Sequence, residues 1–305
     1  MCETNLNLSY HDFIEMNDDF EGLVIRSRFN VDKGAICSKK NLKFIIRIGS
    51  GVEHIDVAFA EANGVKIIST PEGNAPAVAE HCLGMLLCAL KKMTTADKEV
   101  RDGKWLRDKN KGSELSAQTV GIIGFGNTGK AFAKLLQIFG CKILVYDKFK
   151  SGFSETYIEE VSLDELLQRA TVISLHINYL PENHYFVNNN LFKKAKQNPI
   201  IINTSRGLVV NTSDLVFSLD EDYISFACLD VLEFENVNLQ IPPKQEWNDT
   251  LLRLTSNKKV LLTPHTAGQT YDAELRHAGV ALSINHLIVS NAATLHACEM
   301  QPLER

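Results

Sequence analysis

The glycine-rich turn within residues 119–147 constrains the fold more than any other part of the sequence. An apolar run from Val120 to Ile123 predicts a buried strand that leads directly into the turn GFGNTG. Apolar residues then recur at helical spacing, which predicts a helix that opens at the third glycine, Gly129. A second predicted strand, Lys142 to Tyr146, follows and ends at Asp147.

Each glycine of the turn has a separate task if the turn binds a dinucleotide. Gly124 permits the sharp bend, Gly126 lets a pyrophosphate approach the backbone, and Gly129 lets the helix pack on the strand. Backbone N–H groups at the helix start would face the phosphates. Asp147 would accept hydrogen bonds from the ribose hydroxyls and disfavour a 2′-phosphate. Together with both strands, the helix and the terminal acid, the turn predicts that the chain binds NAD.

The composition limits the class of protein. At 305 residues the chain can hold two domains with separate cores, and its formal net charge of −5 argues against a nucleic-acid or membrane-surface partner. No apolar run reaches the ~18 residues that a membrane span needs. The first residues lack the blocks of a signal peptide, and seven cysteines without a CxxC pair indicate reduced thiols. We therefore expect a cytoplasmic protein and, since no metal-ligand spacing is present, no metal.

Strand-like apolar runs alternate with helical segments along most of the chain. Apart from the two strands around the glycine turn, these runs are residues 22–27, 43–48, 65–69, 171–176, 200–203, 224–229 and 260–263. Ala75 to Lys92 and Tyr271 to Ile288 are predicted as long helices. This alternation predicts an α/β fold, with a small parallel unit followed by a doubly wound parallel sheet, and with the last helix crossing back to the first unit.

Side chains suited to hydride transfer follow three of the predicted strands. Arg206 follows one strand, Glu233 and Glu235 lie on the loop after the next, and His265 follows a third. Ligands of such sheets bind outside the carboxyl ends of the strands. Arg206 would bind the carboxylate of a 2-hydroxy acid, His265 would take the hydroxyl proton, and Glu235 would hold the imidazole. Taken singly, Arg206 could equally form a structural ion pair, and His265 could equally be a packing or capping residue.

The order of these motifs resembles that of the NAD-dependent D-isomer-specific 2-hydroxyacid dehydrogenases. The resemblance extends from Gly22 to about Gly268. Besides the glycine turn, it is carried by the motifs RIGSGVEHID at 47–56, VAEH at 78–81, SLH at 174–176, NTSRG at 203–207, LDV at 229–231 and TPH at 263–265. Within the family, the chain is most similar to the branch that oxidises D-3-phosphoglycerate.

The resemblance implies roles for individual residues. The catalytic residues would be Arg206, Glu235 and His265, with Glu235 selected because the family glutamate lies five positions after the aspartate of the LDV motif. The residues expected to contact NAD are Gly124, Gly126, Asn127, Thr128, Gly129, Asp147, His176, Thr204 and Asp230. The residues expected to bind the substrate are Arg26, Arg47, Ser50 and Gly51. Backbone N–H groups of the last two would meet the substrate carboxylate, and both arginines would lie near a phosphate.

The family fold implies two doubly wound parallel-sheet lobes with the active site in the cleft between them. A smaller flavodoxin-like substrate domain would comprise residues 1–75 completed by 270–305, and a Rossmann-type NAD domain would comprise residues 76–269. The family usually forms a homodimer, in which an arm at 98–112 often meets the partner.

This chain departs from the family pattern at three places. We expect the first strand and helix of the outer lobe, which the family carries ahead of a segment like residues 3–20, to be missing, so that this lobe is either incomplete or covered at its edge by another chain. The run INYLP at 177–181 replaces the family's Pro-Leu-Thr after His176. Because the chain ends soon after its last predicted helix, we expect no C-terminal regulatory domain.

The resemblance implies an enzyme that oxidises D-3-phosphoglycerate to 3-phosphohydroxypyruvate, the entry step to serine. One alternative is another D-2-hydroxyacid dehydrogenase, acting on glycerate, glyoxylate or D-lactate. A second alternative is a non-enzymatic NAD-sensing corepressor with the same fold, which should carry a peptide-docking groove and disordered tails. Turnover of candidate hydroxy acids with NAD separates the three.

Overall fold

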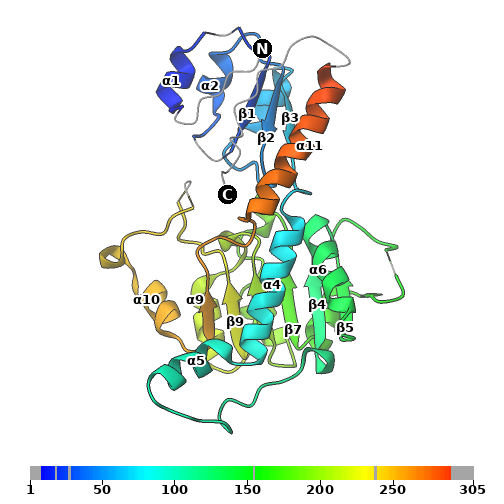
Figure 1. Ribbon diagram of the computed structural model, residues 1–305, viewed down its shortest axis with the longest axis vertical. Helices are drawn as coiled ribbons and strands as arrows, with labels where there is room; N and C mark the ends of the chain where they lie inside the picture. The colour runs from blue at the N-terminus through cyan, green and yellow to red at the C-terminus, as the bar shows by residue number, and fades with distance from the viewer. Residues whose placement is uncertain (1–7, 18, 27–28, 154, 237–238, 290–305) are drawn as a thin grey trace. The chain divides into compact units, whose positions relative to one another are not determined.

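The computed structural model describes residues 8–17, 19–26, 29–153, 155–236 and 239–289 (Figure 1). The chain divides into two compact units: unit 1 is Met1–Asn74 with Gln269–Arg305, and unit 2 is Ala75–Gly268. Within the described ranges, no helix is long and apolar enough to cross a membrane.

Unit 1 is built on a three-stranded parallel sheet in the order β1-β2-β3. Its strands are β1 (Gly22–Ile25), β2 (Phe44–Arg47) and β3 (Lys66–Ser69), and its helices are α1 (Tyr10–Glu15), α2 (Lys33–Cys37), α3 (Val57–Ala62) and α11 (Tyr271–Val289). The register pairs Ile25 with Arg47, and Arg47 with Ser69. The carboxyl ends of the three strands therefore lie in one row.

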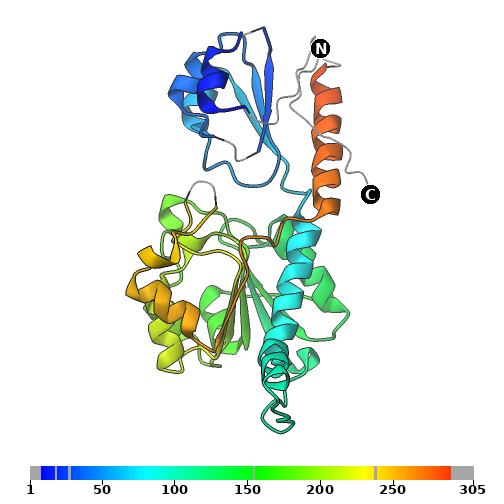
Figure 2. The same cartoon turned by 60° about the vertical axis from the view of Figure 1, so that its left-hand side comes forward.

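The two faces of this small sheet bury different side chains because successive residues of a strand point to opposite faces. In β2, Ile45 packs into a cluster that also contains Phe13 of α1. Phe44 and Ile46 pack on the other face, against Ala281 of α11. Figures 1 and 2 show α11 on the side of the sheet opposite α1 and α2.

Helix α1 lies within residues 3–20, the segment ahead of which we expect the first strand and helix of the outer lobe to be missing. Among residues 8–17 and 19–21, the structure describes this helix and no strand ahead of β1, and the expectation itself stays a prediction. Ser9 and Asp12 form a capping box that starts α1, and Phe13 is completely buried. Local sequence therefore explains why α1 forms here: its first turn is capped, and Phe13 buries its apolar side.

Unit 2 contains a seven-stranded parallel sheet in the order β10-β9-β8-β7-β4-β5-β6. The strands are β4 (Thr119–Ile123), β5 (Lys142–Tyr146), β6 (Glu159–Glu160), β7 (Val172–Leu175), β8 (Ile200–Asn203), β9 (Phe226–Leu229) and β10 (Val260–Leu262). The chain builds outward from β4 to β6 and then returns to place β7 on the other side of β4. This reversal between β4 and β7 is the switch point at which open α/β sheets bind ligands.

Helices cover both faces of the larger sheet. They are α4 (Ala75–Leu90), α5 (Met93–Arg101), α6 (Asn127–Gln137), α7 (Leu163–Arg169), α8 (Asn189–Lys194), α9 (Thr212–Asp220) and α10 (Asp249–Ser256). Short 3-10 helices are η1 (Leu115–Ala117), η2 (Pro181–Asn183), η3 (Gly207–Val209) and η4 (Lys244–Glu246). Figure 2 shows α4, in cyan, on one side of the sheet and the yellow and orange helices of this unit on the other.

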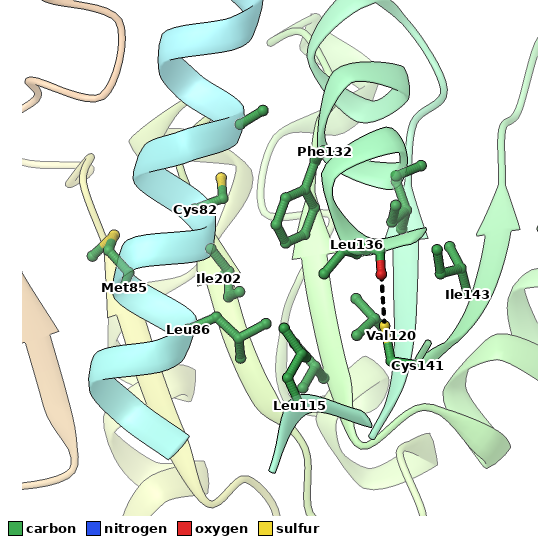
Figure 3. Close-up of a cluster of buried hydrophobic side chains, with 14 of the residues drawn as sticks. Cys82, Met85, Leu86, Leu115, Val120, Phe132, Leu136, Cys141, Ile143 and Ile202 are labelled. Atoms are coloured by element: carbon green, nitrogen blue, oxygen red, sulfur yellow. Dashed lines mark hydrogen bonds between the residues drawn. The ribbon is translucent and has the colours of Figure 1, made fainter. Parts of the chain in front are cut away.

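The layer between α4, α6 and the sheet is closely packed (Figure 3). Cys82 and Leu86 of α4 and Phe132 and Leu136 of α6 are all completely buried there. The Cys141 thiol donates to the carbonyl oxygen of Leu136 at 3.7 Å. The prediction of a long helix from Ala75 is confirmed, and Cys82 and Cys141 are both buried.

Candidate active site

The turn between β4 and α6 requires glycine at two of its three glycine positions. Gly124 has a φ of 95°, and a Cβ there would lie 2.4 Å from the carbonyl oxygen of His176. A Cβ on Gly129 would lie 2.2 Å from the carbonyl oxygen of Gly124. Both distances are far shorter than van der Waals contact. Only glycine therefore allows α6 and the residue after β7 to lie this close to the turn.

Gly126 has a different reason to be glycine. Its φ is −81°, which any residue adopts, and a Cβ there would find open space within 4 Å. It is the N-cap residue of α6, and because glycine has no side chain, the N–H groups of the first turn receive no side-chain hydrogen bond from it. The space beside an uncapped helix N-terminus fits the pyrophosphate of a dinucleotide. Helix α6 also begins at Asn127, two residues before the predicted start, because the residues just after this cap are already helical.

Asp147 anchors the glycine turn from the end of β5. Its Oδ2 accepts the backbone N–H of Phe125 at 2.7 Å. Its Oδ1 accepts the N–H groups of Phe149 and Lys150 at 2.9 and 3.1 Å. A carboxylate can accept about four hydrogen bonds, so these three donors leave capacity for a ribose hydroxyl.

His176 lies buried beneath the turn. Its Nε2 is 2.9 Å from the Ser174 hydroxyl, and its Nδ1 is 3.2 Å from the Thr128 hydroxyl. Burial lowers the pKa of His176 to about 4, so the ring is neutral at neutral pH. Both ring nitrogens face protein hydroxyls, and the His176 carbonyl lies under Gly124. This geometry gives His176 a supporting role beneath the glycine turn.

Arg206 follows β8 on a loop that Asn203 shapes. The Asn203 side chain accepts the N–H of Ser205 and donates to the carbonyl oxygen of Arg206, both at 3.0 Å. At Gly207, a Cβ would lie 2.0 Å from the carbonyl carbon of Leu232. The loops after β8 and β9 therefore touch backbone to backbone, which fixes Arg206 relative to the next loop.

Thr204, one of the residues expected to contact NAD, is also tied to α4. Its hydroxyl lies 3.1 Å from the Cys82 sulfur. Burial raises the pKa of Cys82 to about 12, so this group is a thiol and not a nucleophilic thiolate. The contact fixes the loop after β8 against the helix layer.

The loops after β9 and β10 bring Glu235 and His265 together. Oε2 of Glu235 is 2.5 Å from Nδ1 of His265, and its Oε1 accepts the backbone N–H of Leu232 at 2.5 Å. Exposed fractions of 12% for the glutamate side chain and 21% for the histidine side chain show that both are mostly shielded from water. The imidazole is oriented by a carboxylate that is itself held by the backbone.

Glu233, two residues earlier, has different partners. It accepts hydrogen bonds from the Tyr185 hydroxyl and, at 3.0 Å, from the backbone N–H of Thr212. The carboxylate raises the pKa of Tyr185 to about 12. The contact with the imidazole belongs to Glu235, so the spacing after the LDV motif and the geometry select the same residue.

Asp230 anchors the loop that carries His265. This carboxylate is buried, with an exposed fraction of 1%. It accepts hydrogen bonds from the Thr263 hydroxyl at 2.6 Å and from the N–H groups of Thr266 and Ala267 at 2.9 and 2.8 Å. Its carbonyl accepts the N–H of His265 at 2.8 Å. The sequence assigned Asp230 to contact with NAD, and the structure adds a loop-anchoring role that it did not anticipate.

The backbone of His265 is left-handed, with a φ of 54°. Non-glycine residues rarely adopt this conformation, and those that do cluster at functional sites. His81 of α4 supports the loop from behind, with Nε2 3.0 Å from the Thr263 hydroxyl. Sequence reasoning overlooked the supporting roles of Asn203, Gly207 and Thr263, and the motifs NTSRG and TPH that contain them were the available signal.

The residues expected to bind the substrate all lie in unit 1: Arg26, Arg47, Ser50 and Gly51. Arg26 follows β1 and forms an ion pair with Glu274 of α11, with Nη1 3.0 Å from Oε1. Arg47 ends β2, and its Nη1 donates to the carbonyl of Ile48 at the start of the loop that carries the other two. The structure thus places all four at the carboxyl ends of neighbouring strands or in the loop just after.

Residues 83–267, most of unit 2, match the family model described as D-isomer specific 2-hydroxyacid dehydrogenase, NAD binding domain. The chain belongs to this family. The predictions of the family, of an α/β fold with parallel sheets, of NAD and of an oxidoreductase are confirmed. No cluster of three or more potential metal ligands lies in the part of the chain that the structure describes.

Relatives of this dehydrogenase family match most of the chain. The hydroxypyruvate reductase of Thermotoga maritima is 34% identical over 279 residues, 92% of this chain and 88% of that protein. The D-3-phosphoglycerate dehydrogenase of Archaeoglobus fulgidus is 32% identical over 310 residues, 99% of this chain but 56% of that protein. The crystal structure of D-lactate dehydrogenase from Aquifex aeolicus, complexed with NAD and lactic acid, matches with a TM-score of 0.79 and 28% identity, over 90% of this chain and 84% of that one.

Proposed function

We propose that this dehydrogenase oxidises D-3-phosphoglycerate to 3-phosphohydroxypyruvate, the first step toward serine. The observation that best supports this reaction is the contact between Glu235 and His265. It orients the imidazole at the same edge of the sheet as the glycine turn. Unit 1 would be the substrate domain and unit 2 the NAD domain. The cysteine content of the sequence supports a cytoplasmic location.

The proposed chemistry divides between three side chains. NAD, when bound, supplies the acceptor for the hydride that leaves C2 of the substrate. His265 takes the hydroxyl proton on Nε2, since its Nδ1 faces Glu235. Arg206 pairs with the substrate carboxylate, and Glu235 stabilises the charge that the imidazole gains. Loss of one hydride and one proton converts the hydroxyl carbon to a carbonyl.

The residues that would hold the dinucleotide come from the strand ends around the switch point. Gly126 leaves open space, and the first-turn N–H groups of α6 would face the pyrophosphate. Asp147 would accept from the adenosine ribose. The other proposed contacts are Gly124, Asn127, Thr128, Gly129, His176, Thr204 and Asp230.

Two arginines in unit 1 support a phosphorylated substrate. Such an acid needs cations besides Arg206, which the carboxylate occupies. Arg47 pairs with Ile25 in the register of β1 and β2, so Arg26 and Arg47 stand at adjacent strand ends. Guanidinium groups form charge-assisted and often bidentate hydrogen bonds to phosphate, which suits them to this role.

A second candidate is an unphosphorylated acid, as in a hydroxypyruvate or glyoxylate reductase. The ion pair of Arg26 with Glu274 favours it, because the carboxylate offsets one of the two cations. The relative of 34% identity from Thermotoga maritima, named a hydroxypyruvate reductase, also matches over most of both chains.

The test compares kcat/KM for D-3-phosphoglycerate and D-glycerate in the wild type and in Arg47→Ala. We expect the wild type to prefer the phosphorylated acid. In Arg47→Ala the KM for D-3-phosphoglycerate should rise at least ~10-fold, since a lost charged hydrogen bond is worth about 1.5–3 kcal/mol, and the KM for D-glycerate should stay unchanged. Arg253→Ala is the control, because this arginine pairs with Asp220 at the surface of unit 2. A wild type that prefers D-glycerate, or a variant that impairs both acids equally, would favour the second candidate.

We further propose a homodimer formed through the arm at residues 98–112. This arm exposes large apolar side chains, among them Trp105 at 76% and Val100 at 49%. Grouped exposed apolar residues mark interaction surfaces. Light scattering after size exclusion should give twice the chain mass for the wild type and a smaller mass for Trp105→Ser with Val100→Ser. A monomeric wild type would refute the proposed dimer and would have no bearing on the proposed reaction.

A further inference from the structure

His277, in the second turn of α11, is the buried end of a hydrogen-bond chain in unit 1. Its exposed fraction is 6%, and its Nδ1 lies 2.7 Å from the hydroxyl of Thr70, just after β3. Gly73 lies directly against the ring, since a Cβ on Gly73 would come within 2.2 Å of Nδ1. The neighbouring Arg276 donates through Nε to the carbonyl of Gly73 at 2.9 Å. His277 and Arg276 of α11 thus hold the backbone at Gly73 in place.

Thr70 connects the imidazole to the loop after β2. It is completely buried, its hydroxyl accepts the N–H of Gly49 at 2.9 Å, and its own N–H donates to the Gly49 carbonyl at 3.0 Å. Gly49 has a φ of 127°, so this position is restricted to glycine. The loop that begins at Gly49 is therefore attached to Thr70 by hydrogen bonds in both directions.

The Thr70 hydroxyl contacts three polar groups. Nδ1 of His277 lies at 2.7 Å, the carbonyl oxygen of Arg47 lies at 3.4 Å, and the N–H of Gly49 donates to the hydroxyl oxygen at 2.9 Å. The tautomer of His277 sets the direction of the shortest contact: an Nδ1–H donates to the hydroxyl oxygen, and a bare Nδ1 accepts the hydroxyl proton. In both tautomers the oxygen keeps a lone pair for the N–H of Gly49, so the imidazole holds the hydroxyl in place for that contact. Burial, together with the charge of Arg47, lowers the pKa of His277.

We propose that His277 is a positioning residue for substrate binding, acting through Thr70 on the loop Gly49–Gly51. The inference rests on the proposed function and on the expectation, implied by the family resemblance, that the N–H groups of Ser50 and Gly51 meet the carboxylate of the 2-hydroxy acid. His277 itself touches no substrate. The carboxylate is held alike before and during hydride transfer, so a displaced loop weakens both states and raises KM more than it lowers kcat.

The test uses two matched pairs of variants. His277→Leu fills similar space without an acceptor, and His277→Asn keeps an acceptor near the Nδ1 position. Thr70→Val removes the hydroxyl at nearly constant shape, and Thr70→Ser keeps it. Turnover is measured with D-3-phosphoglycerate or D-glycerate, whichever the wild type oxidises faster, together with the Kd of NAD and the melting temperature.

We expect His277→Leu and Thr70→Val to raise KM about fivefold, the effect of one lost hydrogen bond, with kcat within about twofold of the wild type. His277→Asn and Thr70→Ser should return most of the wild-type KM, and the Kd of NAD should not change. If His277→Leu does not fold, the Thr70 pair decides, because it leaves the ring on Gly73 untouched.

Two kinds of failure can be told apart. A wild type that binds NAD but turns over no D-2-hydroxy acid would refute the proposed function, and this inference with it. An active wild type whose Leu and Val variants keep the wild-type KM, whatever their melting temperatures, would leave the proposed function intact and show that His277 serves packing only.

Discussion

The Nδ1 atom of His265 lies 2.5 Å from Oε2 of Glu235, and the two residues come from loops that follow the paired strands β10 and β9. The second oxygen of Glu235 is held by the N–H of Leu232, and the backbone of His265 is held by Asp230. The chain therefore orients this imidazole through its own contacts. The same arrangement allows the reaction to be tested without disturbing the NAD turn.

Replacing His265 by alanine should reduce kcat by roughly 10²–10⁴, the usual contribution of a general base, and leave the Kd of NAD unchanged. The reason is that the residue lies after β10, whereas the glycine turn follows β4. Steady-state oxidation of the hydroxy acid and fluorescence titration with NAD measure the two quantities. Near-normal turnover by this variant would remove His265 from the mechanism.

The two neighbouring glutamates provide a matched comparison. Glu235→Gln keeps the shape but loses the charge beside His265, so kcat should fall roughly 10-fold or more. Glu233→Gln alters a carboxylate that meets Tyr185 and the N–H of Thr212, so it should lower the melting temperature and keep kcat near the wild-type value. Equal kinetic losses in both variants would contradict the assignment of Glu235.

Gly126→Ala should fold normally and bind NAD at least ~10-fold more weakly, because its added Cβ meets no protein atom but enters the space meant for the pyrophosphate. Gly84→Ala is the control: that helical position in α4 also has open space, and alanine should stabilise it by about 0.5–1 kcal/mol. Calorimetric titration with NAD and thermal melts distinguish them. Wild-type NAD affinity in Gly126→Ala would place the pyrophosphate elsewhere.

Asp147→Asn should lower the preference for NAD over NADP. The amide keeps one acceptor oxygen for the neighbouring backbone, while the negative charge that would repel a 2′-phosphate is lost. Asp147→Ala should weaken both cofactors, because the N–H of Phe125 in the glycine turn loses its acceptor. The ratio of kcat/KM for the two cofactors is the readout, and an unchanged ratio in Asp147→Asn would rule out the proposed ribose contact.

His176 should make the protein less stable in mild acid. Below about pH 6.5 the unfolded chain protonates this histidine, but the folded chain, with a pKa of about 4, does not. The free energy of unfolding therefore falls as the pH drops from 6.5 toward 4, by roughly 3 kcal/mol over the whole window. Urea unfolding of His176→Asn at pH 7 and pH 5 should show a smaller difference than the wild type. His54 and His277, whose pKa values are also lowered, remain and leave a residual slope. The same difference in both proteins would contradict the prediction.

Apolar periodicity was enough to locate nearly all of the sheet strands. Each apolar run singled out in the sequence became a strand. Strands β7 and β8 are buried at every position, and a strand buried on both faces must be continuously apolar. The strand it missed, β6, is a pair of glutamates at the sheet edge and carries no apolar pattern. The predicted run 224–229 began too early: Ile224 is buried, yet it belongs to the turn before β9.

The reactive residues of the candidate site could be predicted, but most of their supports could not. Arg206 and His265 lie in short motifs at strand ends, so local sequence is informative. The carboxylate of Asp230 instead reaches N–H groups 36 and 37 positions away, and Arg26 meets a glutamate 248 positions away. Such partners depend on how strands are ordered in the folded chain, and nothing in the neighbouring sequence encodes them.

Because the backbone of His265 is left-handed, a change at this position that raises stability would remove activity. At a φ of 54° a side chain crowds its own backbone, and glycine relieves that crowding. A library ranked only by resistance to heat would therefore be drawn toward glycine at position 265, and its winners would have lost the imidazole. Thermostable versions of this chain should be sought with residue 265 held fixed and with changes made where the backbone is relaxed.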